Sequence, residues 1–172
     1  MEIDTREDAV SSLPGDLERM FEEHHASVFR AAYRITGNAT DAEDVLQTVF
    51  LRLLGRQGEP AALINPKAYL HRAAVNAALD VVRARRNEAN TPLETVQVSV
   101  PAQDGELREL LRRGLATLPP SMAEVFALRF LEGYSNQEIA RTLSMSQVRV
   151  AVTLHRARRQ LRKEIGLGSV KG

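Results

Sequence analysis

Residues 135–165 combine the signals of a short helix, a three-residue turn and a long helix. Ser135–Glu138 reads SNQE, the form of a capping box, in which the first and last side chains each accept a backbone N–H at a helix start. Ser144–Ser146 then breaks the helical spacing, and Ser146 can cap a second helix from Gln147 to Ile165. This order of elements predicts a helix-turn-helix, which restricts the C-terminal part of the chain to a small helical fold.

The predicted long helix is basic over most of its length. Residues 147–163 contain six arginine or lysine side chains and no aspartate or glutamate. Like charges on one helix repel by roughly a few tenths of a kcal/mol, so such a segment favours an anionic partner. Its apolar side chains recur at three-four spacing and are predicted to face the core: Val150, Leu154, Ala157, Leu161 and Ile165.

The opposite side of this helix carries residues suited to DNA bases. In a helix-turn-helix the start of the second helix enters the major groove, where arginine can bind guanine, glutamine adenine, and valine or threonine methyls thymine. Basic side chains farther along, from Arg158 to Lys163, suit phosphates, which position the protein without specifying sequence. The residues predicted to meet DNA are Gln137, Arg141, Ser146, Gln147, Val148, Arg149, Val152, Thr153, Arg156 and Arg159.

The N-terminal half has the spacing of three amphipathic helices. They are predicted over residues 17–35, 40–55 and 65–86. Gly37 and Asn38 are predicted to end the first helix, and Thr40–Glu43 has the capping-box form expected at the start of the second. Asn65 followed by Pro66 reads as the N-cap and first-turn proline of the third.

Residues 87–105 break the helical spacing and contain two prolines, so we interpret them as a flexible linker. Val96, Val98 and Val100 alternate as in a strand. A lone strand would have no sheet to join in an otherwise helical chain, so an extended linker is the preferred interpretation.

Two more helices are predicted before the helix-turn-helix, one over 107–118 and one from a capping box at Ser121–Glu124 to Gly133. The chain is thus predicted to be all-α, with two small helical domains joined by a flexible linker and a helix-turn-helix in the second. The predicted boundaries are an acidic tail at 1–15, a first domain at 16–86, the linker at 87–105, a second domain at 106–168 and a tail at 169–172.

Charge is distributed unevenly along the chain. Residues 1–60 contain 12 acidic and 6 basic side chains, whereas residues 101–172 contain 7 acidic and 12 basic ones. The two ends are therefore expected to bind different partners. No apolar run reaches the roughly 18 residues of a membrane helix, and the first residues lack the features of a secretory signal. A cytoplasmic protein with no membrane segment of its own is expected.

An enzymatic function finds little support in the sequence. The absence of cysteine excludes disulfides and cysteine-ligated zinc. His24 and His25 are adjacent and would point about 100° apart on a helix, unlike a metal-binding pair one turn apart. No phosphate-binding glycine loop or nucleophile elbow is present. We expect no catalytic residue, no metal and no cofactor, and a conventional helix-turn-helix regulator stays open as an alternative.

Four blocks of sequence occur in an order that is more specific than any single motif. They are DAEDVLQTVFLRLL at 41–54, AYLHRAAVNAALDVVRARR at 68–86, LPPSMAEVFALRFLEGYSNQEIARTL at 118–143 and LHRARRQLRK at 154–163. With them the chain resembles, over about residues 14–165, the bacterial RNA polymerase sigma factors of the extracytoplasmic-function (ECF) group of the sigma-70 family. The resemblance implies a sigma factor that binds core polymerase and directs promoter-specific transcription initiation.

The resemblance also implies partners and site residues. Core RNA polymerase would be bound through its β′ clamp helices and its β subunit, and an anti-sigma factor would hold the chain inactive. The polymerase-binding residues would be Asp41, Asp44, Gln47 and Thr48. The second domain would read the minus-35 promoter element as duplex, and the third helix would read the minus-10 element as separated strand. The minus-10 residues would be Asn76, Asp80, Arg83, Arg85 and Arg86, although Asp80 could instead brace Arg83.

The chain departs from the family pattern at several positions. Tyr69 stands where the family commonly has tryptophan, Thr48 where it has an acid, and Ser144 where it has glycine. Residues 148–153 read VRVAVT where the family commonly has GTVKSR. Since two cations are lost and Arg149 and two valines are gained, we expect a changed minus-35 preference.

Overall fold

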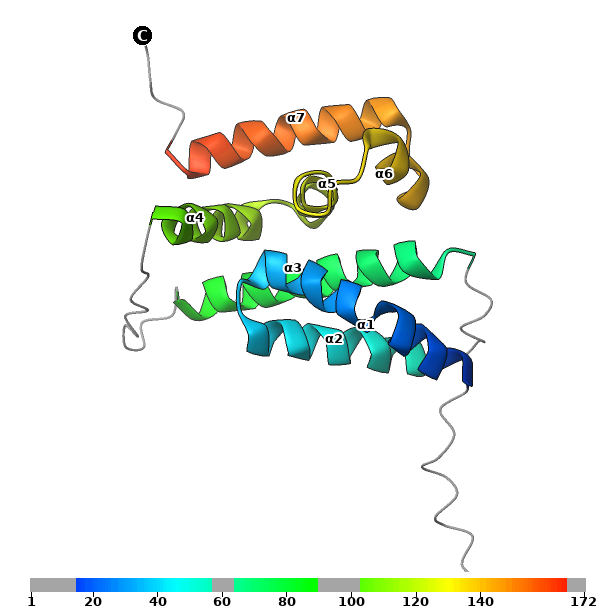
Figure 1. The fold of residues 1–172 in the computed structure, drawn as a ribbon. Helices are drawn as coiled ribbons and strands as arrows, with labels where there is room; N and C mark the ends of the chain where they lie inside the picture. Colours follow the sequence, from blue (N-terminus) through cyan, green and yellow to red (C-terminus); the bar gives the residue numbers. More distant parts are fainter. Residues whose placement is uncertain (1–14, 57–63, 90–102, 167–172) are drawn as a thin grey trace, which may run out of the picture.

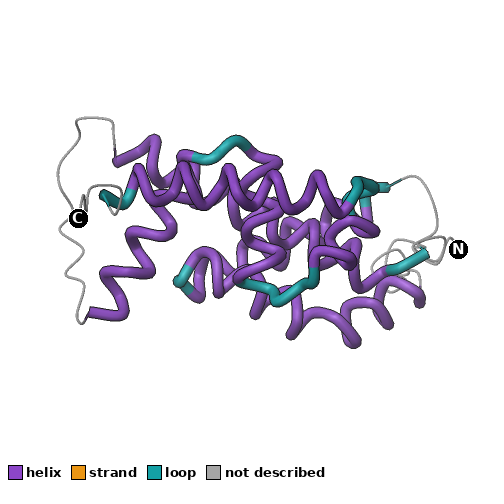
Figure 2. The backbone as a smooth tube through the Cα atoms, turned by 90° about the horizontal axis from the view of Figure 1, so that it is seen from above, coloured by secondary structure: helices purple, strands orange, loops and turns teal. Residues whose placement is uncertain are grey.

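The computed structural model describes residues 15–56, 64–89 and 103–166 (Figure 1). Every regular element in these ranges is a helix (Figure 2), which confirms the predicted all-α class. The helices are α1 (Gly15–Thr36), α2 (Ala39–Leu54), α3 (Pro66–Ala89), α4 (Gln103–Thr117), α5 (Pro120–Phe130), α6 (Asn136–Thr142) and α7 (Gln147–Glu164). The predicted tails and the extended interpretation of Val96–Val100 lie outside the described residues, apart from the innermost residue of the first tail.

Two of the predicted helix N-caps are wrong. Helix α2 begins one residue before Thr40, and its N-cap is Asn38, whose side chain accepts the Asp41 N–H. Helix α5 follows Pro119 and has no side-chain cap. Its predicted capping-box acid, Glu124, is buried and hydrogen-bonds to α3 instead.

The helices on either side of the linker are longer than predicted. Helix α3 continues through Ala89, and α4 begins at Gln103, so both ends of the predicted linker are helical. The predicted starts of α3 and α6 are confirmed: Asn65 accepts the Ala68 N–H at the start of α3, and the capping box of α6 has both of its hydrogen bonds.

The helices form two domains that pack face to face. The N-terminal domain is α1–α3, in which α1 lies against both α2 and α3. The C-terminal domain is α4–α7, in which α7 packs against α4, α5 and α6. Helices α4 and α5 also pack against α3 and therefore lie between α3 and α7 (Figure 1).

Helix α5 shows the effect of this middle position. Six consecutive side chains, Ala123–Leu128, are buried. A helix that packs against the core on one side only would bury just the side chains on that side. The buried side chains of both domains accordingly form one continuous cluster.

Within the C-terminal domain, Gly114 lets α4 approach α7 closely, because a Cβ at this position would lie 2.6 Å from Leu161 Cδ2.

Candidate nucleic-acid and polymerase interfaces

The start of α7 faces solvent. Ser146 caps the helix by accepting the Arg149 N–H at 3.1 Å, and Val150 and Leu154 bury the inner face. On the outer face Val148 is 74% and Val152 44% exposed, values that are unusual for valine in a folded domain. The predicted DNA-facing residues Ser146, Gln147, Arg149, Arg156 and Arg159 are exposed, and Thr153 is half-buried.

Helix α6 presents the other two residues predicted to meet DNA. Gln137 and Arg141 are both exposed, and they lie one turn apart. The helix is fixed at its start by Glu138, whose carboxylate accepts the Ser135 N–H at 2.7 Å. This backbone hydrogen bond holds the pKa of the Glu138 carboxyl below its usual value. Ser144, in the turn that follows, has φ +53°.

One basic side chain of α7, that of Arg158, makes a contact within the protein that was not predicted from the sequence. The Arg158 guanidinium lies over the Phe130 ring of α5, 4.8 Å from its centroid. Arg158 was predicted to bind phosphate, and this contact still leaves it exposed. Stacking on the ring limits the side chain to positions near the end of α5.

Four of the five predicted minus-10 residues of α3, all but the exposed Arg86, are engaged with other parts of the protein or with each other. Asn76 is half-buried and donates from Nδ2 to Glu124 Oε1 of α5 at 2.9 Å. Asp80 and Arg83 form an ion pair at 3.2 Å, which is the bracing interaction weighed from the sequence. Arg85 forms an ion pair with Asp41 of α2.

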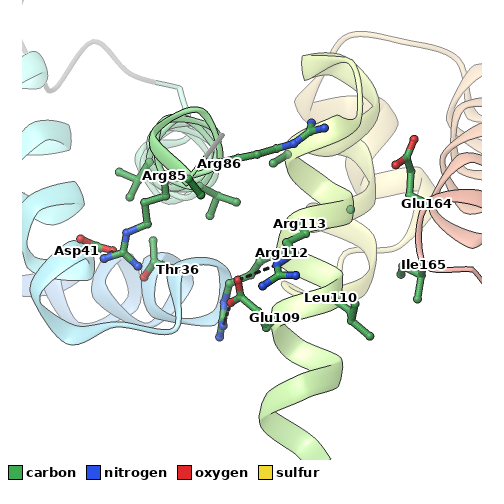
Figure 3. A pocket seen from close by; sticks show the side chains of 15 residues that line it. Thr36, Asp41, Arg85, Arg86, Glu109, Leu110, Arg112, Arg113, Glu164 and Ile165 are labelled. Carbon is green, nitrogen blue, oxygen red and sulfur yellow. Dashed lines mark hydrogen bonds and ion pairs between the residues drawn. The ribbon is translucent and has the colours of Figure 1, made fainter. Parts of the chain in front are cut away.

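A cleft of about 590 Å³ lies beside these arginines, between the two domains (Figure 3). Arg85 and Arg86 line it from α3, and Glu109 and Arg112 line it from α4. The structure thus brings Arg85, a predicted DNA residue, against Asp41, a predicted polymerase residue, at one edge of the cleft.

The predicted polymerase face of α2 divides into an accessible and a less accessible part. Asp44 and Gln47 are exposed. Asp41 is only 15% exposed at its side chain, where it pairs with Arg85. The hydroxyl of Thr48 donates to the Asp44 carbonyl of its own helix at 2.8 Å.

Two leucines of α2 extend this face and were missed from the sequence. Leu51 is 64% and Leu54 48% exposed. They lie at three-four spacing after Asp44 and Gln47, so all four side chains share one side of the helix. The signal was available, because leucine on the outward side of an amphipathic helix is a departure from its polar pattern.

The contacts between the domains were also missed. Glu124 binds Arg72 and Asn76, which are 52 and 48 residues away, and Glu132 binds Arg34, which is 98 residues away. No short-range spacing could have indicated these pairs.

Residues 15–56, 64–89 and 103–166 hold no group of three or more histidines or carboxylates placed to bind a metal ion. Within the same ranges, none of the helices has both the length and the apolar character needed to span a membrane.

Comparison with known proteins places both domains. Residues 20–88 match the family Sigma-70 region 2, and residues 108–161 match Sigma-70, region 4. The chain is similar to the ECF RNA polymerase sigma factor SigE of Mycolicibacterium smegmatis, at 32% identity over 156 residues that cover 84% of this chain and 60% of that protein. The chain therefore spans about three fifths of the length of that relative.

A second relative is matched over most of both chains. The RNA polymerase sigma-E factor of Streptomyces coelicolor is 36% identical over 143 residues, covering 81% of this chain and 80% of that one. Among solved structures, the sigma factor RpoE in complex with the anti-sigma factor NepR from Bartonella quintana has the same fold, with a TM-score of 0.51, 20% identity and coverage of 90% of this chain and 99% of that one. The chain belongs to the ECF RNA polymerase sigma factors.

Proposed function

We propose that this chain acts as an alternative sigma factor, which binds core RNA polymerase and directs initiation at promoters with its own minus-10 and minus-35 elements. The observation that carries this is the capped and exposed start of α7 in a chain that matches both sigma regions. A sigma factor is a regulator of transcription, so the chemistry of RNA synthesis belongs to the polymerase.

The outer face of α7 is proposed to read the minus-35 element. Arg149 can donate two hydrogen bonds to guanine, and the methyls of Val148 and Val152 can contact thymine. Their exposure is consistent with this role, since two outward valines on a solvated helix would leave apolar surface in water. Arg156 and Arg159 are proposed to hold the flanking phosphates.

Helix α3 is proposed to read the minus-10 element as separated strand, through Asn76 and the arginines that follow it. Unstacking a base costs a few kcal/mol and is offset by stacking and contacts to the base edge. The linker would let both domains engage their elements together, which makes the second contact effectively intramolecular.

The α2 face formed by Asp44, Gln47, Leu51 and Leu54 is proposed to dock on the polymerase β′ clamp helices. Its acidic start disfavours DNA phosphates, and its two exposed leucines suit a protein partner. Reversing the charge with Asp44→Arg should weaken association with core polymerase by at least tenfold, measured by fluorescence anisotropy. Glu43→Arg makes the same charge change about 100° around the helix and serves as the control. Equal binding by both variants would mean that polymerase docks elsewhere.

We further propose that the chain works in the cytoplasm, where its polymerase is, and is held inactive by an anti-sigma factor. The support is the solved sigma factor of the same fold, which was crystallised with an anti-sigma factor.

Run-off transcription from a promoter library tests the main proposal. Core polymerase with this chain should initiate at promoters that share two spaced elements, and core polymerase alone should not. If initiation fails while the free chain binds duplex DNA tightly, the chain acts as a conventional helix-turn-helix regulator instead.

A further inference from the structure

Two carboxylates of the C-terminal domain have buried side chains and partners in the other domain. The Glu124 side chain on α5 is 10% exposed, and the Glu132 side chain, just after α5, is 1% exposed. Burying a carboxylate is costly unless a cation or several hydrogen bonds compensate for the lost water. Both acids therefore depend on what the N-terminal domain supplies.

Glu124 is compensated by α3. Its Oε1 accepts from Arg72 Nε at 2.5 Å and from Asn76 Nδ2 at 2.9 Å. Arg72 and Asn76 lie one turn apart on the same side of α3, and they converge on a single oxygen atom. The carboxylate thus sits where these two side chains can receive an anion.

Glu132 is compensated by α1 and α3. Its two oxygens accept from Arg34 Nη1 at 3.1 and 3.2 Å, and His71 Nδ1 lies 3.9 Å away. The same histidine nitrogen is 2.9 Å from the Tyr134 hydroxyl, which holds the ring against the start of the helix-turn-helix.

A third contact between the domains lies next to Arg34, at the C-terminal end of α1. Arg112 of α4 donates from Nε to the Ile35 carbonyl at the C-terminus of α1, 3.2 Å away. Its guanidinium lies against Gly37, where a Cβ would come within 1.8 Å of Nη2. Gly37 also has φ +65°, so the turn favours glycine here, and a side chain would in addition displace the Arg112 guanidinium.

We propose that these contacts form an internal lock, in which Glu124 occupies Arg72 and Asn76 in place of promoter DNA. The lock is defined by Glu124, Glu132, Arg34, Arg72 and Asn76. The inference rests on the proposed minus-10 role of α3 and adds two statements to it: Arg72 contacts the minus-10 strand, and the closed chain is unable to make that contact.

Charge explains why such a lock can open. Paired carboxylates hold the interface in one register, yet each regains full hydration when the domains separate. Apolar side chains of similar volume would often hold the domains at least as firmly. A nucleic-acid phosphate can replace the carboxylate on Arg72, so DNA and Glu124 compete for the same donors.

The first experiment measures opening. The chain contains no cysteine, so Glu43→Cys and His155→Cys place one dye on an exposed site of each domain. Energy transfer in the full-length chain should fall in Glu124→Arg, which sets two cations against each other. The exchanged pair Arg72→Glu with Glu124→Arg should restore it, which a merely misfolded variant would not do. Glu106→Arg, the same change on an exposed part of α4, is the control and should leave energy transfer unaltered.

The second experiment measures competition with DNA. The ligand is the non-template strand of a promoter recovered by run-off transcription, with the full-length chain in solution. The closed population reduces apparent affinity in proportion to the open fraction, so Glu124→Gln should bind at least about tenfold more tightly than the wild type. Adding Arg72→Ala should lower this affinity again.

The two experiments fail in different ways. Unchanged energy transfer in Glu124→Arg would overturn the lock, whatever the transcription result. A fall in energy transfer without a gain in strand binding would leave the domains locked by Glu124 but remove the minus-10 role of Arg72 and Asn76. Unchanged strand binding on adding Arg72→Ala would remove Arg72 alone from the DNA contact.

Discussion

The two helices proposed to read promoter DNA, α3 and α7, differ in what already occupies them. The start of α7 is open to water, with Val148, Gln147 and Arg149 exposed. On α3, Asn76 is engaged by Glu124 of the other domain and Arg85 by Asp41. The duplex-reading helix is thus available in this structure, and the strand-reading helix is not.

The difference follows from where the acids lie. Residues 147–163 contain six cations and no acid, and α7 lies on the side of α4 and α5 away from α3 (Figure 1). Helix α3 faces α5, whose Glu124 is buried between the two domains. A helix that reads single strand is useful only after the duplex opens, so a covered α3 prevents contact with DNA before that step.

Arg149→Ala should have the largest effect, a loss of affinity for duplex DNA that is confined to α7. Loss of the two hydrogen bonds from Arg149 to guanine should cost about 1–3 kcal/mol in affinity for the preferred minus-35 duplex. The loss should be the same in the Glu124→Arg background, because closure leaves α7 uncovered. Anisotropy titrations with cognate and substituted duplexes measure both values. A loss that depends on the state of Glu124 would show that the two helices are coupled.

Arg112→Met should loosen the closed state moderately. The variant keeps the aliphatic stem but loses the donor to the Ile35 carbonyl, which should favour opening by about 1 kcal/mol. Arg112 pairs with Glu109 at 3.2 Å and Arg113 pairs with it at 3.4 Å, so Arg113→Met, on a side chain that is 70% exposed, is the matched control. The dye pair described above reports both. Equal effects of the two variants would mean that the change comes from the lost ion pair with Glu109 and not from the lost hydrogen bond to the Ile35 carbonyl of α1.

Acidification should open the chain by a smaller amount. Burial lowers the pKa of His71 below 6.5; Glu132 beside it opposes this shift, whereas Lys67, Arg34 and His24 reinforce it. Opening removes both the burial and Glu132, of which burial has the larger effect, so the pKa of the ring rises and it binds a proton more readily in the open state. The closed state should therefore hold above about pH 7 and weaken as the pH falls through 6.5. Energy transfer between pH 8 and 5.5 measures this, and His71→Gln should flatten the response; an unflattened response would exclude His71 as its source.

Ser144→Gly should have the smallest effect. Ser144 adopts φ +53°, which costs a residue with a side chain about 1–2 kcal/mol, although glycine loses more entropy on folding. A net gain of about 0.5–1 kcal/mol in the free energy of unfolding is expected, measured with urea. Domain opening should not change, and a change would place this turn within the closed interface.

Local patterns predicted the helix-turn-helix well. The capping boxes and caps act within three or four residues, so Ser135, Glu138 and Ser146 could be assigned from spacing alone. The same logic failed at Asn38 and Thr40, since both can cap, and the extended backbone at Asn38 decides.

Long-range contacts could not be predicted in this way. Glu124 has a capping-box position in the sequence, yet its carboxylate pairs with Arg72 from the other domain. Asp41 was assigned to polymerase by the resemblance to sigma factors, yet it is paired with Arg85. Each of these outcomes is set by packing between helices that are far apart in the chain, and single-sequence patterns contain no record of it.

The burial of α5 on all sides has a consequence for how the protein can be handled and how it works. Separating the domains would expose apolar side chains on the face of α5 that now lies against α3. An isolated C-terminal domain would have the same exposed surface, and exposed apolar patches promote self-association. The open state is therefore best tolerated when a partner covers that surface. Polymerase would then both bind the open chain and keep the apolar side chains of α5 out of water.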